Sequence, residues 1–307
     1  NEMFVGNYHV LDIGLHPDFI ESVKTPYTFI EQETIESYII PRTRFAHKGD
    51  FGHALLIAGS YGKMGACVLA AKAALRSGIG LLTVHIPSKG YNIIQTSVPE
   101  AMASIDFDAK VFTYLPRLTQ HNAIGIGPGI GVHKASKDAF FKLLKKNLPL
   151  VIDADGINML AKKPEWIKLI PHDSILTPHP KEFDRLVGES QNSYERLQKQ
   201  ILLAKDINSI VIVKGHFTAI ATPNGKVFFN TTGNAGMATG GSGDVLTGII
   251  LSLVAQGFLP CEAALTGVFI HGLAADMAVK TLSQTSLIAS DIIDALPEVF
   301  LSLENNE

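Results

Sequence analysis

The sequence predicts an α/β fold in which a mostly parallel sheet is covered by helices on both faces. Short β-branched apolar runs alternate with longer helical patterns along most of the chain, which is the rhythm of β-α-β units. Glycine-rich or polar motifs begin where the predicted strands end, at the sheet edge where open α/β folds bind ligands. With 307 residues, 46% of them hydrophobic and 18% charged, the chain is long enough for one large domain or two small ones.

The predicted elements follow one another in a regular order. The predicted strands are residues 54–58, 81–86, 123–126, 150–153, 174–177 and 210–214. The helices predicted between them are residues 66–77, 136–146, 156–161, 181–187 and 194–208. Residues 217–222 and 227–230 flank an Asn-Gly turn and form a predicted β-hairpin. Three predicted helices without an intervening strand follow, at about residues 245–256, 261–282 and 290–303.

Composition and charge exclude several classes of protein. The net charge is −3 and no run is rich in Lys or Arg, so a nucleic-acid partner is not expected. Cys67 and Cys261 match no metal or redox spacing, which predicts reduced thiols in a cytoplasmic protein. The longest apolar run, residues 245–254, is too short to cross a bilayer, and no signal peptide is visible. We therefore expect no membrane partner.

The most informative segment is a glycine-dense loop that leads into an apolar helix, residues 234–251, with the sequence NAGMATGGSGDVLTGIIL. Its glycines are Gly236, Gly240, Gly241 and Gly243. They let the backbone come close to a ligand, so that successive N–H groups and the positive end of the helix point at one anion. Asp244 would repel that anion unless it handles a proton or a metal-bound hydroxyl, which predicts a catalytic role. The alternative is that Asp244 is an ordinary N-cap of the helix.

This loop is not a Walker A motif, because no Lys-Ser or Lys-Thr closes it. It resembles the anion-hole segment of the ribokinase-like superfamily and, within it, that of the ADP- or ATP-dependent NAD(P)H-hydrate dehydratases, which repair hydrated NADH and NADPH. Four further segments occur in the order of that family: HKGDFG at 47–52 with the strand, loop and helix after it, AIGIGPGIG at 123–131, LTPHPKEF at 176–183 and VKGHFTAI at 213–220. The resemblance covers residues 44–303 and implies a ribokinase-like three-layer α/β/α fold with a mostly parallel central sheet.

The resemblance also implies a role for each matching residue. Asp244 is the expected catalytic residue, which activates a substrate hydroxyl toward the terminal phosphate of a nucleotide. The expected anion hole is Gly240, Gly241, Ser242 and Gly243, and the expected substrate contacts are Ala66, Gly129, His179 and Asp244. The expected nucleotide contacts are Lys214, Gly215, His216, Phe217, Thr218 and Gly243. Glu182 is expected near Mg²⁺, which it would contact through water.

Some of these motifs also have a structural interpretation when each is taken alone. The GxxGxxG pattern of Gly59, Gly62 and Gly65 is compatible with a tight turn as well as with a nucleotide site, and so is the turn at Gly129. Lys214 follows a β-branched strand, where a lysine either neutralises phosphate or extends from the strand end into solvent.

The polar residues near the strand ends leave further alternatives open. His179 stands between two prolines where related kinases carry Thr-Pro-Asn-x-x-Glu, which favours a function over a loop histidine satisfied by backbone. Glu182 also suits the first turn of a solvated helix. Asp153 and Asp155 either hold Mg²⁺ through water or cap the helix that follows. His271 is interpreted as a core or interface residue and not as a ligand.

The implied chemistry is a kinase reaction diverted into a lyase reaction. The terminal phosphate of ADP, or of ATP, is transferred to the ring hydroxyl of the S form of NADH hydrate or NADPH hydrate, and phosphate then leaves as the ring double bond is restored. ADP gives AMP, and Mg²⁺ bridges the phosphates. A small-molecule kinase of the same superfamily and a non-catalytic nucleotide sensor are the alternatives. The TPHP and GPGIG segments argue against the kinase, and Asp244 argues against the sensor.

Residues 1–36 are interpreted separately from residues 37–307, the expected dehydratase domain. The run VGNYHVLDIGLHP resembles the closing strand of the NAD(P)H-hydrate epimerase domain, which many bacterial proteins carry ahead of the dehydratase. This predicts a linker or a remnant of such a domain, and an ordinary N-terminal strand and linker is the alternative. From the family we also expect a homo-oligomer, namely a tetramer.

Overall fold

A computed structural model describes residues 11–39 and 41–304 of the chain. Within these residues ten strands form one sheet in the order β1-β10-β9-β8-β7-β6-β5-β2-β3-β4. The strands are β1 Tyr27–Phe29, β2 His53–Ile57, β3 Leu81–Pro87, β4 Met102–Asp106, β5 Ala123–Ile126, β6 Leu150–Ile152, β7 Ile175–Leu176, β8 Ile210–Val213, β9 Ala219–Ala221 and β10 Val227–Phe229. Because β3 and β4 lie on one side of β2 and β5 lies on the other, the strand order reverses between β2 and β5. Ligands of open α/β sheets bind at such a reversal.

The strands from β4 across to β8 are all parallel to one another. Strand β9 runs antiparallel to both β8 and β10, which are its two neighbours, and β1 is parallel to β10. The hairpin predicted on the Asn-Gly turn is therefore confirmed, with Gly225 at a positive φ of 84° in its turn. The prediction of a mostly parallel sheet is also confirmed.

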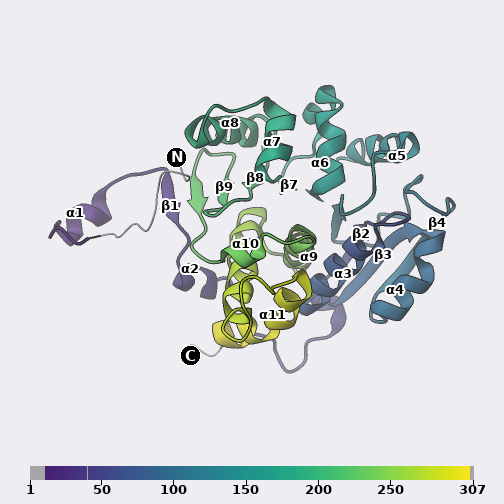
Figure 1. The fold of residues 1–307 in the computed structure, drawn as a ribbon, viewed down its shortest axis with the longest axis horizontal. Helices are drawn as coiled ribbons and strands as arrows, with labels where there is room; N and C mark the ends of the chain where they lie inside the picture. Colours follow the sequence, from purple (N-terminus) through teal and green to yellow (C-terminus); the bar gives the residue numbers. More distant parts are fainter. Residues whose placement is uncertain (1–10, 40, 305–307) are drawn as a thin grey trace.

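Helices cover both faces of the sheet (Figure 1). The helices are α1 Pro17–Ser22, α2 Gln32–Glu36, α3 Met64–Arg76, α4 Tyr91–Ser97, α5 Lys134–Leu144, α6 Ala154–Ala161, α7 Pro180–Val187, α8 Ser193–Asp206, α9 Ser242–Ala255, α10 Pro260–Ala278 and α11 Ala289–Glu304. Figure 1 shows α5 to α8 along one side of the sheet and α3, α9, α10 and α11 along the other. The two layers follow from the pleat of the strands, in which successive side chains point to opposite faces. Leu56 of β2 packs on the face covered by α3, α9, α10 and α11, while Leu55 and Ile57 pack on the face covered by α5 to α8.

The N-terminal part of the described chain belongs to the same packed unit. Strand β1 adds to the sheet edge beside β10, and α2 packs against α10 and α11. Ile30 and Ile35 are buried in the core on that side. Residues 1–10, which hold the first half of the run that resembles an epimerase strand, lie outside the described residues. The division of the chain at residue 36 stays a prediction.

Two elements between β3 and β5 were not predicted from the sequence. Strand β4 pairs with β3 at the sheet edge, and α4 precedes it. The polar residues Ser104 and Asp106 interrupt the apolar pattern of β4, because both face His85 on β3. Nδ1 of His85 lies 3.0 Å from the Ser104 hydroxyl, and its Nε2 lies 3.3 Å from the Asp106 carboxylate.

No helix in the described residues is long and apolar enough to span a membrane. Cys67 on α3 and Cys261 on α10 are free thiols, and burial raises the pKa of each above its usual range. Thiols of that kind are poor nucleophiles.

Candidate active site

The predicted site motifs meet at the carboxyl edge of the sheet. They follow β2, β5, β6, β7 and β8 and are joined there by the start of α9. Backbone contacts tie the loop after β2 to the loop after β5: the N–H of Gly59 donates to the carbonyl of Pro128 at 2.7 Å, and the Ser60 hydroxyl donates to the carbonyl of Gly129 at 2.6 Å. The strand-order reversal lies between these two loops, so the crevice expected from topology is also where the motifs converge.

Gly129 and Ala66, both predicted to contact substrate, are neighbours. Gly129 has a positive φ of 63°, and a Cβ built there would lie 3.1 Å from the Cβ of Ala66 and 2.8 Å from the carbonyl oxygen of Lys63. Only glycine fits this close approach. The turn is braced by Asp155, whose carboxylate accepts from the N–H of Gly131 at 2.9 Å and pairs with the ammonium of Lys63 at 3.3 Å.

Helix α9 begins at the glycine loop, and Asp244 is not its N-cap. The capping position is held by Gly241, which has a left-handed φ of 94° and no side chain to cap with. Asp244 is the third residue of the helix, in its first turn. The interpretation of Asp244 as the N-cap of the helix is therefore wrong.

The pKa of Asp244 is strongly raised. Burial, followed by the negative charge of Asp153, raises the pKa of Asp244 to about 7, although the ammonium of Lys214 acts in the opposite direction. Within the described residues, no hydrogen bond to the Asp244 carboxylate is present that would hold it in the charged form. A carboxylate whose pKa lies near neutral pH is well placed to exchange a proton with a substrate.

Asp153 directly follows β6 and connects several segments of the site through its side chain. Its buried carboxylate accepts hydrogen bonds from the hydroxyls of Thr177 and Thr247, each at 2.8 Å. It also pairs with the ammonium of Lys214 at 3.0 Å. One carboxylate thus links β6, β7, β8 and α9. The sequence left Asp153 open between a magnesium ligand and a helix cap. Its side chain makes no capping bond and accepts from these three donors instead.

Lys214 is fixed against the start of α9. A Cβ built on Gly243 would lie 3.1 Å from the Lys214 ammonium, so the lysine lies directly over the backbone of the predicted anion hole. The ion pair with Asp153 keeps it there. The alternative of a lysine that extends freely into solvent is therefore wrong. A fixed ammonium beside the N-terminus of a helix adds a point charge where an anion would bind.

The other predicted nucleotide contacts form a turn between β8 and β9. The Thr218 hydroxyl closes this turn by donating to the Gly215 carbonyl at 3.1 Å, and it lies 3.3 Å from the Gly215 N–H. Nothing lies within 4 Å of a Cβ built on Gly215, so the backbone there is open. The ring centroids of His216 and Phe217 are 4.6 Å apart, and Phe217 is partly exposed. The turn therefore offers open backbone and aromatic surface next to Lys214.

His179 and Glu182 cap each other at the start of α7. The N–H of Glu182 donates to Nδ1 of His179 at 3.3 Å, and the N–H of His179 donates to the Glu182 carboxylate at 3.0 Å. Burial lowers the pKa of His179, although Glu182 acts in the opposite direction. A neutral His179 with a fixed ring orientation is suited to contact a ligand by hydrogen bonding. Glu182 is buried, which excludes the solvated interpretation of this residue.

Helix α10 holds Ser242 through His271 and holds the glycine loop through Asp276, which the sequence did not single out. Nε2 of His271 lies 3.3 Å from the hydroxyl of Ser242, and burial lowers the pKa of His271 to about 4. Asp276 accepts from the N–H of Gly233 at 2.7 Å and from the Asn234 side chain at 2.9 Å. The interpretation of His271 as a core residue is confirmed, and it also positions the anion hole. Only a tertiary structure brings these distant residues together.

The carboxylates at the carboxyl edge of the sheet fit Mg²⁺ only when they bind it through water. No group of three or more His, Cys, Asp or Glu side chains in the described residues has the arrangement of a metal cage. Both oxygens of Asp153 already accept from protein donors, whereas Glu182 is hydrogen bonded at one oxygen. Mg²⁺ commonly binds through substrate phosphates and waters with one or two carboxylates. Glu182 is the carboxylate here that fits this mode.

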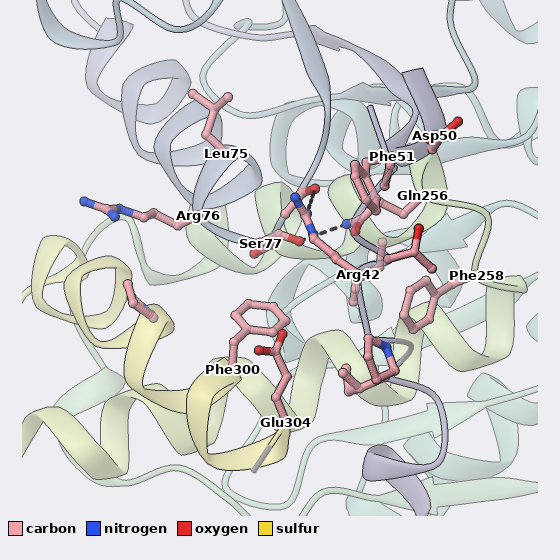
Figure 2. A pocket seen from close by; sticks show the side chains of 17 residues that line it. Arg42, Asp50, Phe51, Leu75, Arg76, Ser77, Gln256, Phe258, Phe300 and Glu304 are labelled. Atoms are coloured by element: carbon pink, nitrogen blue, oxygen red, sulfur yellow. Dashed lines mark hydrogen bonds between the residues drawn. The ribbon is translucent and has the colours of Figure 1, made fainter. Parts of the chain in front are cut away.

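A separate cavity of about 640 Å³ lies at the opposite, amino edge of the strands (Figure 2). Its lining comes from the segment before β2, the end of α3, the end of α9 and α11. Figure 2 shows Arg42 in its centre, with its guanidinium carbon 3.8 Å from the ring centroid of Phe51 and a hydrogen bond to the Gly78 carbonyl. None of the predicted site residues lines this cavity. It is therefore distinct from the candidate active site.

Comparison with known proteins identifies the family. The sequence model of the NAD(P)H-hydrate dehydratase family matches residues 54–298. The bifunctional NAD(P)H-hydrate repair enzyme Nnr of Moorella thermoacetica is 36% identical over 310 residues, which are 97% of this chain and 58% of that enzyme. The chain thus spans a little over half the length of that curated relative.

Solved structures agree with the predicted fold. The crystal structure of the ADP/ATP-dependent NAD(P)H-hydrate dehydratase from Bacillus subtilis, co-crystallised with ATP/Mg²⁺, matches with a TM-score of 0.80 and 32% identity over 90% of this chain and 99% of that chain. A ribokinase-like superfamily protein from Enterococcus faecalis matches with a TM-score of 0.78 and 29% identity over 92% of this chain and 98% of that chain. The ribokinase-like three-layer fold is therefore confirmed, and the chain belongs to the NAD(P)H-hydrate dehydratase family.

Proposed function

We propose that this protein is an ADP-dependent (S)-NAD(P)H-hydrate dehydratase, a lyase that returns the S forms of NADH hydrate and NADPH hydrate to NADH and NADPH, with ADP or ATP as co-substrate. The observation that carries the proposal is Asp244, a carboxylate with a pKa of about 7 in the first turn of a helix that begins at a glycine loop. Family membership supports the same reaction.

The first step is phosphoryl transfer to the ring hydroxyl of the hydrate. Asp244 accepts the hydroxyl proton while the hydroxyl oxygen bonds to the terminal phosphorus of the nucleotide. The bond between that phosphorus and the oxygen of the departing nucleotide breaks, so ADP leaves as AMP. Lys214 and the N–H groups of residues 240–243 stabilise the charge on the transferring group, because they are held in place before the reaction.

The second step expels phosphate from the phosphorylated ring. The bond between the ring carbon and oxygen breaks, the oxygen leaves with the phosphate, and a ring proton is lost as the double bond re-forms. Each NADH restored is therefore matched by one AMP and one free phosphate. When Mg²⁺ is bound, it neutralises part of the phosphate charge, and Glu182 is the residue that would hold it through water.

A stoichiometry experiment tests the reaction directly. NADH hydrate is prepared in ¹⁸O-water and incubated with the protein, Mg²⁺ and ADP, and NADH absorbance, AMP and free phosphate are followed together. We expect equal amounts of all three, with the ¹⁸O label in the phosphate, because the hydroxyl oxygen leaves with it. A small-molecule kinase would leave the phosphate on an organic product, and a sensor would consume no nucleotide.

Return of NADH without nucleotide consumption would contradict the mechanism. The matched pair of variants is Asp244→Asn at the site and Asp294→Asn on the exposed face of α11. We expect turnover of the first to fall at least about 100-fold with nucleotide affinity kept, since acid–base catalysis contributes that much. Turnover of the second should stay unchanged.

The location, assembly and domain division of the protein belong to the same proposal. We propose that it acts in the cytoplasm as a homo-oligomer, namely a tetramer, and that residues 37–307 form its dehydratase domain, and residues 1–36 a linker or a remnant of an epimerase domain. The family resemblance is the support for these points. Sedimentation equilibrium of the full chain tests the assembly, and a monomer across micromolar concentrations would refute it.

A further inference from the structure

Three loops at the carboxyl edge of β2, β3 and β4 meet around the ring of Tyr61. The ring is exposed, with 64% of the residue accessible to solvent. The ammonium of Lys89 lies 5.1 Å from the ring centroid, and that of Lys110 lies 5.7 Å from it. The surface therefore presents an exposed aromatic ring with two ammonium groups over it. We call Tyr61, Lys89 and Lys110 the Tyr61 platform.

Backbone hydrogen bonds hold the platform together. The N–H of Tyr61 donates to the carbonyl of Lys110 at 2.8 Å, which joins the loop after β2 to the loop after β4. The N–H of Ser88 donates to the carbonyl of Asp108 at 3.0 Å, and that of Lys89 donates to the carbonyl of Ala109 at 3.3 Å. The ring and the two lysines are therefore fixed relative to each other at the level of the main chain.

The two cations are available to a ligand. Asp108, the carboxylate beside them, accepts from the N–H groups of Lys110 and Val111, and these bonds hold its pKa below the usual range. Within the described residues neither Lys89 nor Lys110 forms an ion pair with a carboxylate. By contrast, Lys63 in the same loop as Tyr61 is paired with Asp155. The charge of Asp108 acts on Lys110 through space and offsets part of the positive charge, so the two ammonium groups leave a local excess of positive charge.

The platform is continuous with the predicted dinucleotide site. Ser60, next to Tyr61, donates to the carbonyl of Gly129, and the carbonyl of Lys63 lies against the same glycine. Gly129 in turn contacts Ala66. A dinucleotide bound along the loops after β2 and β5 would therefore have one end near Tyr61.

We propose that the Tyr61 platform binds the adenosine end of the substrate and makes the protein prefer NADPH hydrate over NADH hydrate. The adenine stacks on Tyr61, and Lys89 and Lys110 bind the 2′-phosphate that only the NADP form carries. Aromatic rings bind any base through its face, so Tyr61 contributes to both substrates. Lysine is a point charge suited to phosphate, so the two cations contribute to one substrate alone. The inference rests on the proposed function, because it assigns the dinucleotide to these loops.

Binding of the intact reduced cofactors tests the platform without turnover. Protein saturated with ADP and Mg²⁺, so that the nucleotide site is filled, is titrated with NADPH and with NADH by calorimetry. We expect NADPH to bind at least about tenfold more tightly than NADH, as a charge-assisted phosphate contact would give. Lys89→Gln combined with Lys110→Gln should remove that preference by weakening NADPH alone. In turnover assays the same double variant should raise KM for NADPH hydrate and leave kcat unchanged.

Two further variants separate stacking from charge. Tyr61→Ala should weaken NADPH and NADH by a similar factor of about ten, whereas Tyr61→Phe keeps the ring and should bind as the unmodified protein does. Lys145→Gln is the matched control, because Lys145 also lies over a ring, that of Phe141 at 4.2 Å, but follows α5 at the other edge of the sheet. It should change neither affinity.

The outcomes separate this inference from the proposed function. Equal affinity of the unmodified protein for NADPH and NADH, or a double variant that weakens both alike, would overturn the platform while the hydrate assay still supports the dehydratase. Binding of neither cofactor together with no return of NADH from its hydrate would overturn both. A tenfold preference that disappears in the double variant supports the platform.

Discussion

Asp244 is the residue whose chemistry depends most on its surroundings. Because burial and Asp153 raise its pKa to about 7, only part of the protein carries the basic carboxylate at neutral pH. The proposed reaction needs that carboxylate form, so kcat/KM should rise about tenfold per pH unit below pH 7 and level off above it. Initial rates with NADH hydrate at subsaturating concentration, from pH 5.5 to 8.5, measure this. A profile that stays flat over that range would contradict the assignment of Asp244 as the base.

The same pKa has a consequence for stability. An aspartate whose pKa is higher in the folded state favours the protonated form there, so stability is lost as pH rises from about 4 through 7. Asp244→Asn mimics the protonated form and should raise the free energy of unfolding by about 2 kcal/mol above pH 7, after allowance for partial exposure. Urea unfolding at pH 4 and pH 8 measures it. The gain should vanish at pH 4, and an equal gain at both values would point to another cause.

Individual residues also show what the sequence was able to predict. The glycine loop and Asp244 were identifiable because each has a strong local signal, namely dense glycine followed by an acid at a helix start. The interactions of Asp153 were not, because its donors Thr177, Lys214 and Thr247 lie 24, 61 and 94 residues away along the chain. A buried carboxylate and a capping carboxylate look the same until the tertiary partners are known.

At the scale of elements, the contact between α9 and α3 sets the position of the anion hole. A Cβ on Gly248 would lie 2.1 Å from the carbonyl oxygen of Ala70, so the two backbones touch. Gly248→Ala should push α9 away, lowering the free energy of unfolding by about 2 to 3 kcal/mol and reducing kcat, since Asp244 lies on the same helix. Chemical denaturation and turnover measure both effects.

The matched comparison for this variant is Gly267→Ala on α10. There the Cβ would lie 2.7 Å from Cγ1 of Ile250, a side-chain atom that can move, so the cost should be smaller. If both variants lowered the free energy of unfolding equally, the backbone contact at Gly248 would contribute no more to stability than the side-chain contact at Gly267.

The edge strand β1 and helix α2 give a second prediction at this scale. Deleting residues 1–25 removes α1, whose Phe19 and Ile20 are exposed, and should leave turnover within a few-fold. Deleting residues 1–36 also removes β1 and the buried Ile30 and Ile35, which should cost at least about 3 kcal/mol of stability. Thermal unfolding of the two truncated proteins measures the difference. Equal stability would show that β1 and α2 contribute nothing to the packed unit.

These edge elements were hard to predict from sequence for a physical reason. Strand β1 has three residues, all exposed, and pairs with β10 across about 200 residues of chain. Strand β4 carries polar residues at two positions, Ser104 and Asp106, which contact the buried His85, so its apolar pattern is interrupted. The central strands β2 and β5 were predicted correctly because they are buried on both faces and carry no polar residue beyond the first.

At the scale of the whole molecule, the site is assembled from segments that one sheet edge brings together. Lys214 follows β8, Asp244 lies in the first turn of α9 and Gly129 follows β5, and neither helix layer alone holds all three. The order of motifs along the chain identified the family, and the strand order explains why the motifs meet. A ligand that contacts several of them should therefore stabilise the sheet and both helix layers together.

Nucleotide binding provides the test. At 100 times its dissociation constant, ADP with Mg²⁺ adds about 2.7 kcal/mol of stability, which for a chain of this length corresponds to a rise in Tm of about 4 °C. Lys214→Gln should abolish most of this rise, because it removes the cation held over Gly243. Asp244→Asn should keep it, since losing a negative charge does not weaken phosphate binding. Chelation of Mg²⁺ should reduce it in the unmodified protein. If Lys214→Gln were stabilised by ADP as fully as the unmodified protein, the nucleotide phosphates would have to bind away from the start of α9, and the proposed phosphoryl transfer would lose its geometry.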